Sequence, residues 1–219
     1  MISLKAIEFT QGEFCIKDLN CEITQGEYVI IMGNTGSGKT TILEMICGLR
    51  TPTSGEIILN NQNVTNLKPA LRGIGYVPQD GALFPGLSVR ENLGFALELR
   101  KFDNEQIAEK VERISKELKV SHLLDRGITS LSGGEKQRIA LGRAIIFKPT
   151  VLLFDEPLSA LDSETHTELC ELLKSISEDR ELTIIHVTHN INEADLLGDR
   201  LIRLQDGKLI STQSNKKDE

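Results

Sequence analysis

The sequence predicts an α/β fold in which helices pack against a largely parallel β-sheet. The run Tyr28–Met32 (YVIIM) is apolar, as a buried strand should be, and Thr41–Cys47 after it has a helical pattern closed by Gly48. A second apolar run, Val151–Pro157 (VLLFDEP), is typical of a central strand. Helix and strand patterns then alternate until a hairpin turn at Asp206-Gly207, which completes the α/β pattern.

Two other parts of the chain have different patterns. The N-terminal part predicts several strands, including a hairpin at Glu56–Val64 with Asn60 and Asn61 in the turn. A helical stretch follows, in which Ser88 and Glu91 form a capping box. Apolar residues then recur at helical spacing and are assigned to core packing, at Ile107, Val111, Ile114 and Leu118.

The segment GNTGSGKT, between the first apolar strand and its helix, matches the phosphate-binding pattern of Gly, four residues, Gly, Lys, and Ser or Thr. Its glycines allow successive backbone N–H groups to point at phosphate oxygens, and a helix beginning near Lys39 adds its positive end. Lys39 is predicted to reach the β- and γ-phosphates, and the Thr40 hydroxyl to ligate Mg²⁺. The predicted ATP-binding residues here are Gly33, Asn34, Thr35, Gly36, Ser37, Gly38, Lys39, Thr40 and Thr41.

The central strand VLLFDEP ends in two adjacent acids, Asp155 and Glu156. The carboxyl edge of an open α/β sheet is where ligands bind, so two acids there indicate a function. Asp155 suits a magnesium role through the metal's water shell, and Glu156 suits a general base that polarises water. Taken alone, the segment could instead be an ordinary helix start with Pro157 in the first turn.

The segment LSGGEKQ, at 131–137, contains a second candidate anion site. Ser132 and Glu135 form a capping box, while Gly133 and Gly134 leave backbone N–H groups exposed at a helix N-terminus. If both anion sites met one phosphate tail within a chain, one chain would suffice. If they lie on opposite faces, two chains must enclose each ATP.

These motifs occur in an order that resembles the nucleotide-binding subunit of an ATP-binding cassette (ABC) transporter, over essentially all 219 residues. The resemblance implies a single ABC ATPase domain, 1–219, with a P-loop NTPase (RecA-like) core, an N-terminal antiparallel β subdomain and an inserted α-helical subdomain. Residues 1–80 and 131–219 would form the core with its β subdomain, and 81–130 the helical subdomain. Gln79 would then lie at the hinge between them.

The resemblance also implies a head-to-tail dimer, with ATP and Mg²⁺ as cofactors. Gly33–Thr40 of one chain and Ser132–Gln137 of the other would enclose each ATP. Asp162, in SALD, resembles the D-loop aspartate that crosses the dimer interface. Because all of these motifs are intact in this chain, we expect a homodimer, and a heterodimer with a different subunit stays open.

Two more residues take catalytic roles from the resemblance. Gln79, in VPQD, resembles the Q-loop glutamine that touches Mg²⁺ or the attacking water and senses the transport partner. His189, in VTHN, resembles the switch histidine that contacts the γ-phosphate, whereas His186 is expected to be an ordinary polar residue at a strand end. The predicted catalytic residues are Glu156, His189, Gln79 and Lys39, and the predicted metal-binding residues are Thr40, Gln79 and Asp155.

Outside the phosphate loop, the predicted ATP-binding residues are Phe14, Ser132, Gly133, Gly134, Glu135 and Asp162. Phe14 lies about where the family places an aromatic side chain that stacks on adenine. Phe9 is the alternative, and a core role for both stays open because aromatic residues pack in cores more often than they form platforms.

The segment GALFPGLSV, at 81–89, resembles importer cassettes, especially those for molybdate, tungstate, sulfate and similar small solutes, although Gly81 replaces a tyrosine common there. The segment before LSGGEKQ lacks the Glu-rich stretch typical of ABC exporters. The resemblance therefore implies an ATP-hydrolysing subunit that powers solute import through ATP-driven dimer closure. Its partners would be an integral membrane permease and a solute-binding protein, and its location the cytoplasmic face of the cell membrane.

Other ABC-type functions stay open on the sequence: a soluble assembly complex, a cell-envelope regulatory complex, or an exporter. DNA-repair and chromosome-organising ATPases carry a long coiled coil before the signature, which the segment 80–130 lacks. The net charge of −7 also disfavours a nucleic-acid partner. No apolar run approaches the roughly 20 residues that span a bilayer, no signal peptide is evident, and the four scattered cysteines predict buried free thiols.

Overall fold

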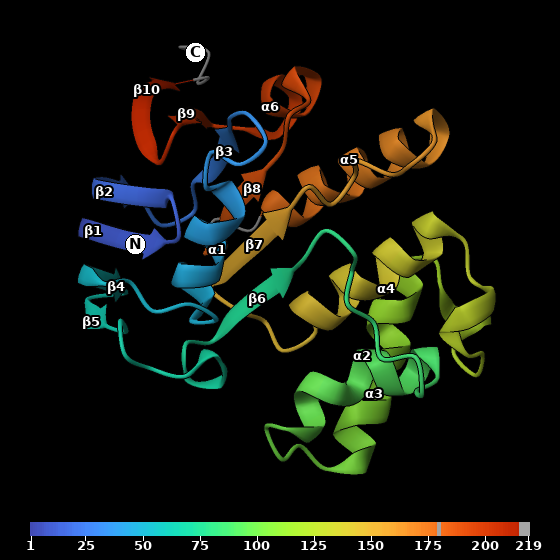
Figure 1. The fold of residues 1–219 in the computed structure, drawn as a ribbon. Helices are drawn as coiled ribbons and strands as arrows, with labels where there is room; N and C mark the ends of the chain where they lie inside the picture. Colours follow the sequence, from blue (N-terminus) through green and yellow to red (C-terminus); the bar gives the residue numbers. More distant parts are fainter. Residues whose placement is uncertain (179–180, 215–219) are drawn as a thin grey trace.

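The computed structural model describes residues 1–178 and 181–214, and these form two β-sheets with helices around them (Figure 1). The larger sheet has the order β10-β9-β3-β8-β7-β6, in which all neighbouring strands are parallel except β10 and β9, which are antiparallel. Its strands are β3 (Tyr28–Met32), β6 (Ile74–Val77), β7 (Val151–Asp155), β8 (Thr183–Val187), β9 (Arg200–Gln205) and β10 (Lys208–Ser214). The smaller sheet is antiparallel, with the order β2-β1-β4-β5. Its strands are β1 (Ile2–Gln11), β2 (Phe14–Ile23), β4 (Ser54–Leu59) and β5 (Gln62–Asn63).

The helices of the described residues begin with α1, directly after the phosphate loop. They are α1 (Lys39–Cys47), α2 (Val89–Glu98), α3 (Asn104–Glu117), α4 (Gly133–Ile145), α5 (Ser163–Ser177) and α6 (Ile191–Leu197). Three short 3₁₀ turns are η1 (Pro69–Leu71), η2 (Ser121–Leu123) and η3 (Ile128–Ser130). Within this part of the chain, every helix is too short or too polar to cross a membrane.

The larger sheet separates two apolar cores. In β3, Tyr28 and Ile30 face the core shared with α2 to α6, while Val29 and Ile31 face the core shared with α1 and the smaller sheet. This alternation follows from the two-residue period of a strand, and burial on both faces explains the continuous apolar run. Figure 1 shows the same division, with α2, α3 and α4 gathered at the lower right and the smaller sheet at the left.

Both predicted hairpins are confirmed. β4 pairs antiparallel with β5, and both turn residues, Asn60 and Asn61, have positive φ angles of 47° and 65°. β9 pairs antiparallel with β10 around Asp206 and Gly207, whose φ angles are 48° and 73°. Asparagine, aspartate and glycine tolerate this left-handed region, which is why these dipeptides indicated turns in the sequence.

The predicted helical stretch is also present. The Ser88 capping box opens α2, and the apolar positions assigned to packing are buried or packed against the core. A further capping box, formed by Asp103 and Gln106 at the start of α3, was missed by the sequence reasoning. The helices share one continuous core with the sheet, so the boundary of the subdomain at 81–130 stays a prediction.

The cysteine prediction is confirmed in part. All four are free thiols, but only Cys47 and Cys170 are buried, whereas Cys15 and Cys21 are half-exposed on β2 of the smaller sheet. Burial raises the pKa of the Cys47 thiol, and it raises that of Cys170 to about 11. Thiols with raised pKa are poor nucleophiles, so these two serve as core residues.

Candidate nucleotide site

Several positions in the loop between β3 and α1 require glycine. Gly36 and Gly38 have φ angles of 80° and 105°, and a Cβ at Gly38 would lie 2.7 Å from Cζ of Phe14. A Cβ at Gly33 would lie 2.2 Å from the carbonyl oxygen of Leu204. The loop therefore presents backbone N–H groups with no side chains in the way, as a phosphate cradle requires.

Two polar side chains in this loop are suited to an anionic ligand. The Nζ atom of Lys39 lies over the loop and donates to the carbonyl oxygens of Gly33 (2.7 Å) and Asn34 (3.0 Å). The Oγ atom of Ser37 is buried without a hydrogen-bond partner, which costs about 1–3 kcal/mol. The loop is braced from outside, because Gly207 N donates to the Ser37 carbonyl oxygen (3.0 Å).

The two acids after β7 lie in different environments. Asp155 is buried and bonded to the Thr40 hydroxyl; burial raises the pKa of Asp155, and this hydrogen bond opposes the rise. Glu156 is half-exposed and has a φ of 48°, although it is not glycine. Its backbone N–H donates to the Val187 carbonyl oxygen (2.9 Å), so the sheet holds it in this strained conformation. Strain of this kind, about 1–3 kcal/mol per residue, clusters at functional sites.

One cavity of about 490 Å³ brings together predicted residues that are far apart in the sequence. Phe14, Lys39, Thr40, Gln79 and Glu156 all line it. Gln11 at the end of β1 also lines it and was missed, because nothing in the sequence near Gln11 indicates a ligand. The cavity therefore brings together residues that the sequence predicted to bind ATP or to act in its hydrolysis.

The two candidate aromatic residues are in different places. Phe14 is half-buried, lines this cavity and lies against Gly38. Phe9 packs in the core between the sheets, with the Arg50 guanidinium 5.6 Å from its ring centroid. Only Phe14 is therefore positioned to meet a ligand, and its stacking on adenine stays a prediction.

His189 lies next to Glu156, outside the residues that line this cavity. Its exposed side chain lies 3.2 Å from Glu156, between Nδ1 and Oε2. A smaller cavity of about 270 Å³ places His189 beside Gly33, Asn34 and Arg203. His189 is thus close both to the phosphate loop and to the acid that follows β7.

The LSGGEKQ segment lies elsewhere in the same chain. The Ser132 capping box is confirmed, with Glu135 N donating to Ser132 Oγ (3.2 Å) and Ser132 N to Glu135 Oε2 (2.7 Å). A Cβ at Gly134 would lie 2.4 Å from Thr165 Cγ2 in the first turn of α5, which Asp162 caps. These residues line neither cavity described above, and Figure 1 shows the start of α4 on the far side of the molecule from α1. Within one chain, the two candidate anion sites do not meet.

The expectation for His186 was wrong. His186 lies inside β8 rather than at its end and is fully buried. Its Nδ1 is 3.0 Å from the Tyr28 hydroxyl, and its Nε2 is 3.3 Å from Oε2 of the buried Glu193. Sequence reasoning missed this cluster because its members come from different strands and helices.

The Glu193 carboxylate makes stability sensitive to acid. Burial raises its pKa, but the contacts with His186, His166 and Thr188 outweigh burial and lower the pKa to about 2 from 4.5. A carboxylate with a lowered folded-state pKa stabilises the fold above its unfolded pKa and loses that effect as pH falls toward the folded value. We expect the free energy of unfolding, measured with urea, to fall between pH 4.5 and about 2. This loss of unfolding free energy should be smaller in Glu193→Gln than in a control, Glu56→Gln. An equal loss in both variants would contradict the role of Glu193 in the acid sensitivity.

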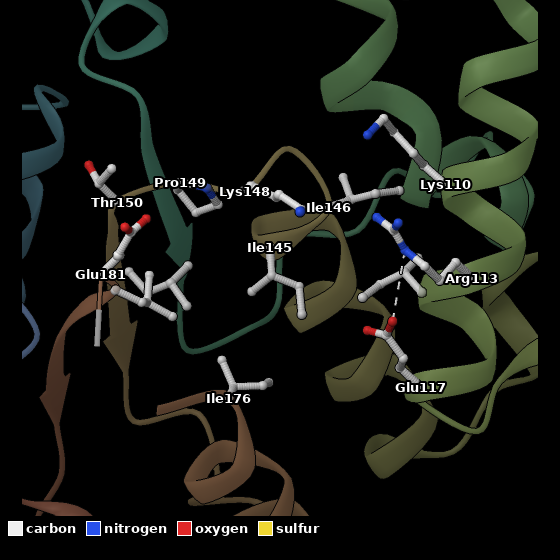
Figure 2. Close-up of a pocket in the computed structure, with 13 residues that line it drawn as sticks. Lys110, Arg113, Glu117, Ile145, Ile146, Lys148, Pro149, Thr150, Ile176 and Glu181 are labelled. Carbon is white, nitrogen blue, oxygen red and sulfur yellow. Dashed lines mark ion pairs between the residues drawn. The ribbon is translucent and has the colours of Figure 1, made fainter. Parts of the chain in front are cut away.

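A larger cavity, of about 530 Å³, lies between α3, the ends of α4 and α5, and the start of β7 (Figure 2). Thr150 lines it just before β7, at the opposite end of that strand from Asp155. Lys110 and Arg113 of α3 line the cavity together with Glu117, which is 3.9 Å from Arg113. The cavity therefore has mixed charge and is separate from the phosphate loop.

The residues present fit a magnesium ion held jointly with phosphate. Among the described residues, no group of three or more His, Cys, Asp or Glu could hold a metal by itself. Mg²⁺ usually keeps several waters and takes one or two protein oxygens plus phosphate oxygens. Thr40 and Asp155, hydrogen-bonded to each other beside the phosphate loop, supply oxygens of that kind.

Comparison with solved structures agrees with the fold described above. The ATP-binding cassette MJ0796, solved as a dimer in a post-hydrolysis state with ADP and Pi bound, matches with a TM-score of 0.90 at 33% identity. The match covers 99% of this chain and 100% of that chain. Its fold is therefore the fold described here, including both sheets and the helical stretch.

Comparison with known sequences gives the family. The chain is 40% identical over 210 residues to the molybdate/tungstate import ATP-binding protein WtpC of Pyrococcus horikoshii, covering 96% of this chain and 61% of that protein. It is 40% identical over 207 residues to the maltose/maltodextrin import ATP-binding protein MalK of Photorhabdus laumondii, covering 94% and 56%. The chain thus spans less than two thirds of the length of either relative. A sequence profile described as ABC transporter matches residues 16–159. The chain therefore belongs to the ABC transporter family.

Proposed function

We propose that this chain is the ATP-binding and ATP-hydrolysing subunit of an importer, and that it drives transport by closing and reopening a dimer. One observation supports the proposal most strongly. The cavity at the phosphate loop joins Lys39, Thr40, Gln79 and Glu156, while the LSGGEKQ segment lies apart from it. This is the arrangement expected of half a nucleotide site whose other half comes from a second chain.

Within the site, each residue has a role that its position supports. The backbone N–H groups of Gly33–Gly38 bind the phosphate tail. The Lys39 ammonium donates to β- and γ-phosphate oxygens in place of the two loop carbonyl oxygens. Glu156 orients and polarises the attacking water. His189, 3.2 Å from Glu156, secures the γ-phosphate, while Gln79 contacts the metal or the water.

Magnesium would be held by Thr40 and Gln79, with Asp155 acting through the metal's water shell. Bound there, Mg²⁺ would supply positive charge that offsets the negative charge developing on the phosphate during transfer. Thr40 and Asp155 orient each other through their hydrogen bond, and burial of Asp155 keeps its carboxylate in one position. Phosphoryl transfer then depends mainly on positioning and electrostatic stabilisation.

The second half of each site would come from a second copy of the chain. Ser132, Gly133 and Gly134 present backbone N–H groups at the start of α4, and Asp162 lies nearby at the start of α5. In a head-to-tail homodimer, these groups would cover the γ-phosphate bound by the partner's loop. The dimeric state of the solved cassette supports this arrangement.

Coupling to transport would pass through the segment that follows Gln79. Arg143 of α4 donates to the carbonyl oxygens of Gly81 (2.9 Å) and Ala82 (2.7 Å), and its guanidinium lies 4.9 Å from the ring centroid of the exposed Phe84. This ties the segment after Gln79 to the helix that carries the LSGGEKQ residues. A short helix of a membrane permease would dock beside this segment, as in other helix-in-groove contacts.

The cargo we propose is molybdate, tungstate or a similar small solute, delivered to the permease by a solute-binding protein. The similarity to a molybdate/tungstate import protein supports this choice. The similarity to a maltose/maltodextrin import protein supports a cargo choice made outside the cassette. The subunit would act at the cytoplasmic face of the membrane. Soluble-assembly, regulatory and exporter functions are the alternatives that the following experiment separates.

The test is affinity capture of tagged Glu156→Gln protein with Mg-ATP from detergent-solubilised source cells. We expect recovery of an integral membrane subunit, together with a protein that binds molybdate or tungstate by calorimetry. A parallel capture with Lys39→Ala, which should not close on ATP, controls for nonspecific recovery. Recovery of soluble partners alone would mean that the ATPase serves an assembly or regulatory complex. Recovery of a membrane subunit whose vesicles transport outward would contradict import.

A further inference from the structure

Glu193, in the first turn of α6, lies at the centre of a buried polar cluster. Its side chain is 3% exposed, yet its carboxylate meets His166 Nε2 (2.8 Å), His186 Nε2 (3.3 Å) and the Thr188 hydroxyl. Burying a carboxylate is costly unless donors surround it. An apolar residue of similar size would suffice to pack α6 on the sheet, so packing alone does not account for a carboxylate here.

The cluster contacts the residue immediately before His189. Thr188 is buried, its hydroxyl bonds Glu193, and the same oxygen accepts from the backbone N–H of Asn190 (3.1 Å). Its own backbone N–H donates to the Ile31 carbonyl oxygen in β3 (3.2 Å). The backbone on both sides of His189 is thus fixed, although the His189 side chain itself is exposed.

The cluster also contacts the helix that Asp162 caps. His166 lies in the first turn of α5, and its backbone N–H donates to the Asp162 carbonyl oxygen (2.9 Å). Through its Nε2 atom, the same residue reaches Glu193. One carboxylate therefore connects the segment before His189 with the first turn of the helix that follows Asp162.

We propose that Glu193 is a positioning residue that, through the Thr188 hydroxyl, holds the backbone of His189 in place for hydrolysis and links it to the Asp162 helix. The proposal rests on the role proposed above for His189. Glu193 itself touches neither the phosphate loop nor Glu156 and takes no part in the chemistry. It acts by keeping His189 near Glu156, 3.2 Å apart, while the phosphate-binding cavity is built from other segments.

The test is Thr188→Val, which keeps the volume and β-branching but removes the hydroxyl. We expect kcat for ATP hydrolysis to fall about 10-fold, because small misplacements of a catalytic group are costly, with KM for Mg-ATP changed less than about twofold. Thr188→Ser retains the hydroxyl and should restore kcat. Thr183→Val is the matched control, because it removes a buried hydroxyl at the other end of β8 that accepts from Gly26 N (3.1 Å). Thr183→Val and Thr188→Val should lower the melting temperature by similar amounts, but Thr183→Val should leave kcat unchanged.

A second comparison shows whether the effect passes through His189. In a His189→Ala background, adding Thr188→Val should not reduce the residual single-turnover rate further, because residues acting through one another are not additive. Full additivity, or wild-type kcat in Thr188→Val, would overturn the inference while leaving the proposed function intact. Wild-type kcat in His189→Ala itself would overturn both the inference and the His189 role.

Discussion

Glu156→Gln is expected to lower kcat for ATP hydrolysis by about 10²- to 10⁴-fold, the usual contribution of a general base. The amide keeps the size of the side chain, so ATP affinity measured by calorimetry should change little. The Glu156 side chain lines the cavity at the phosphate loop, and the sheet holds the Glu156 backbone in a left-handed conformation. The substitution therefore removes the base without removing the site.

Because this variant binds ATP without hydrolysing it, Mg-ATP should hold it as a closed dimer. Light scattering after size-exclusion chromatography would give the mass of two chains with Mg-ATP and of one chain without it. Glu56→Gln, which changes a glutamate on the smaller sheet that accepts from Asn63, serves as the control and should hydrolyse ATP normally. If Glu156→Gln stays monomeric at saturating Mg-ATP, the proposal that two chains enclose each ATP is wrong.

Lys39→Ala and Ser132→Arg should each abolish hydrolysis, yet an equal mixture of the two should regain activity. Losing Lys39 removes charged hydrogen bonds to phosphate, each worth about 1.5–3 kcal/mol, so ATP affinity should drop on the order of 100-fold. Ser132→Arg would obstruct the second anion surface, at a cost of about 1 kcal/mol for the lost helix cap. In a head-to-tail dimer of one chain of each type, one site has both defects and the other has neither.

The mixture should therefore recover up to about a quarter of the wild-type rate, because about half of the dimers formed are mixed and each has one intact site. Steady-state ATPase assays on the separate and mixed proteins measure this directly. Combining both substitutions in one chain and mixing it with Lys39→Ala gives the control, since no dimer then has an intact site. If mixing restores nothing while each variant still dimerises, the two anion surfaces do not act in trans.

Local sequence was sufficient for the individual elements. The limits of β3 and the start of α1 were predicted because an apolar run, a glycine loop and a helical pattern are each set by neighbouring residues. The turns at Asn60-Asn61 and Asp206-Gly207 were predicted for the same reason, since a positive φ favours only a few residue types. The capping box at Ser132 also depends on residues only three positions apart.

Contacts between distant segments could not be predicted in the same way. Gly207 braces the carbonyl of Ser37, and Gln11 lines the phosphate cavity, but no local pattern marks either. His186 was assigned to a strand end because the sequence does not show that Glu193 lies opposite it in the fold. A buried charge becomes interpretable only when its partners are known.

The sequence by itself determined the chemistry of this protein: a phosphate loop, two acids after a central strand and a second glycine-rich helix start, each defined by residues close together in the chain. The tertiary structure decided how these pieces combine. It brought Gln79 and Glu156 to the phosphate loop, and it left the LSGGEKQ segment on another part of the surface beside Asp162. The physical reason is that backbone propensities and side-chain chemistry are local, whereas the burial of two apolar cores against one sheet fixes which distant segments meet.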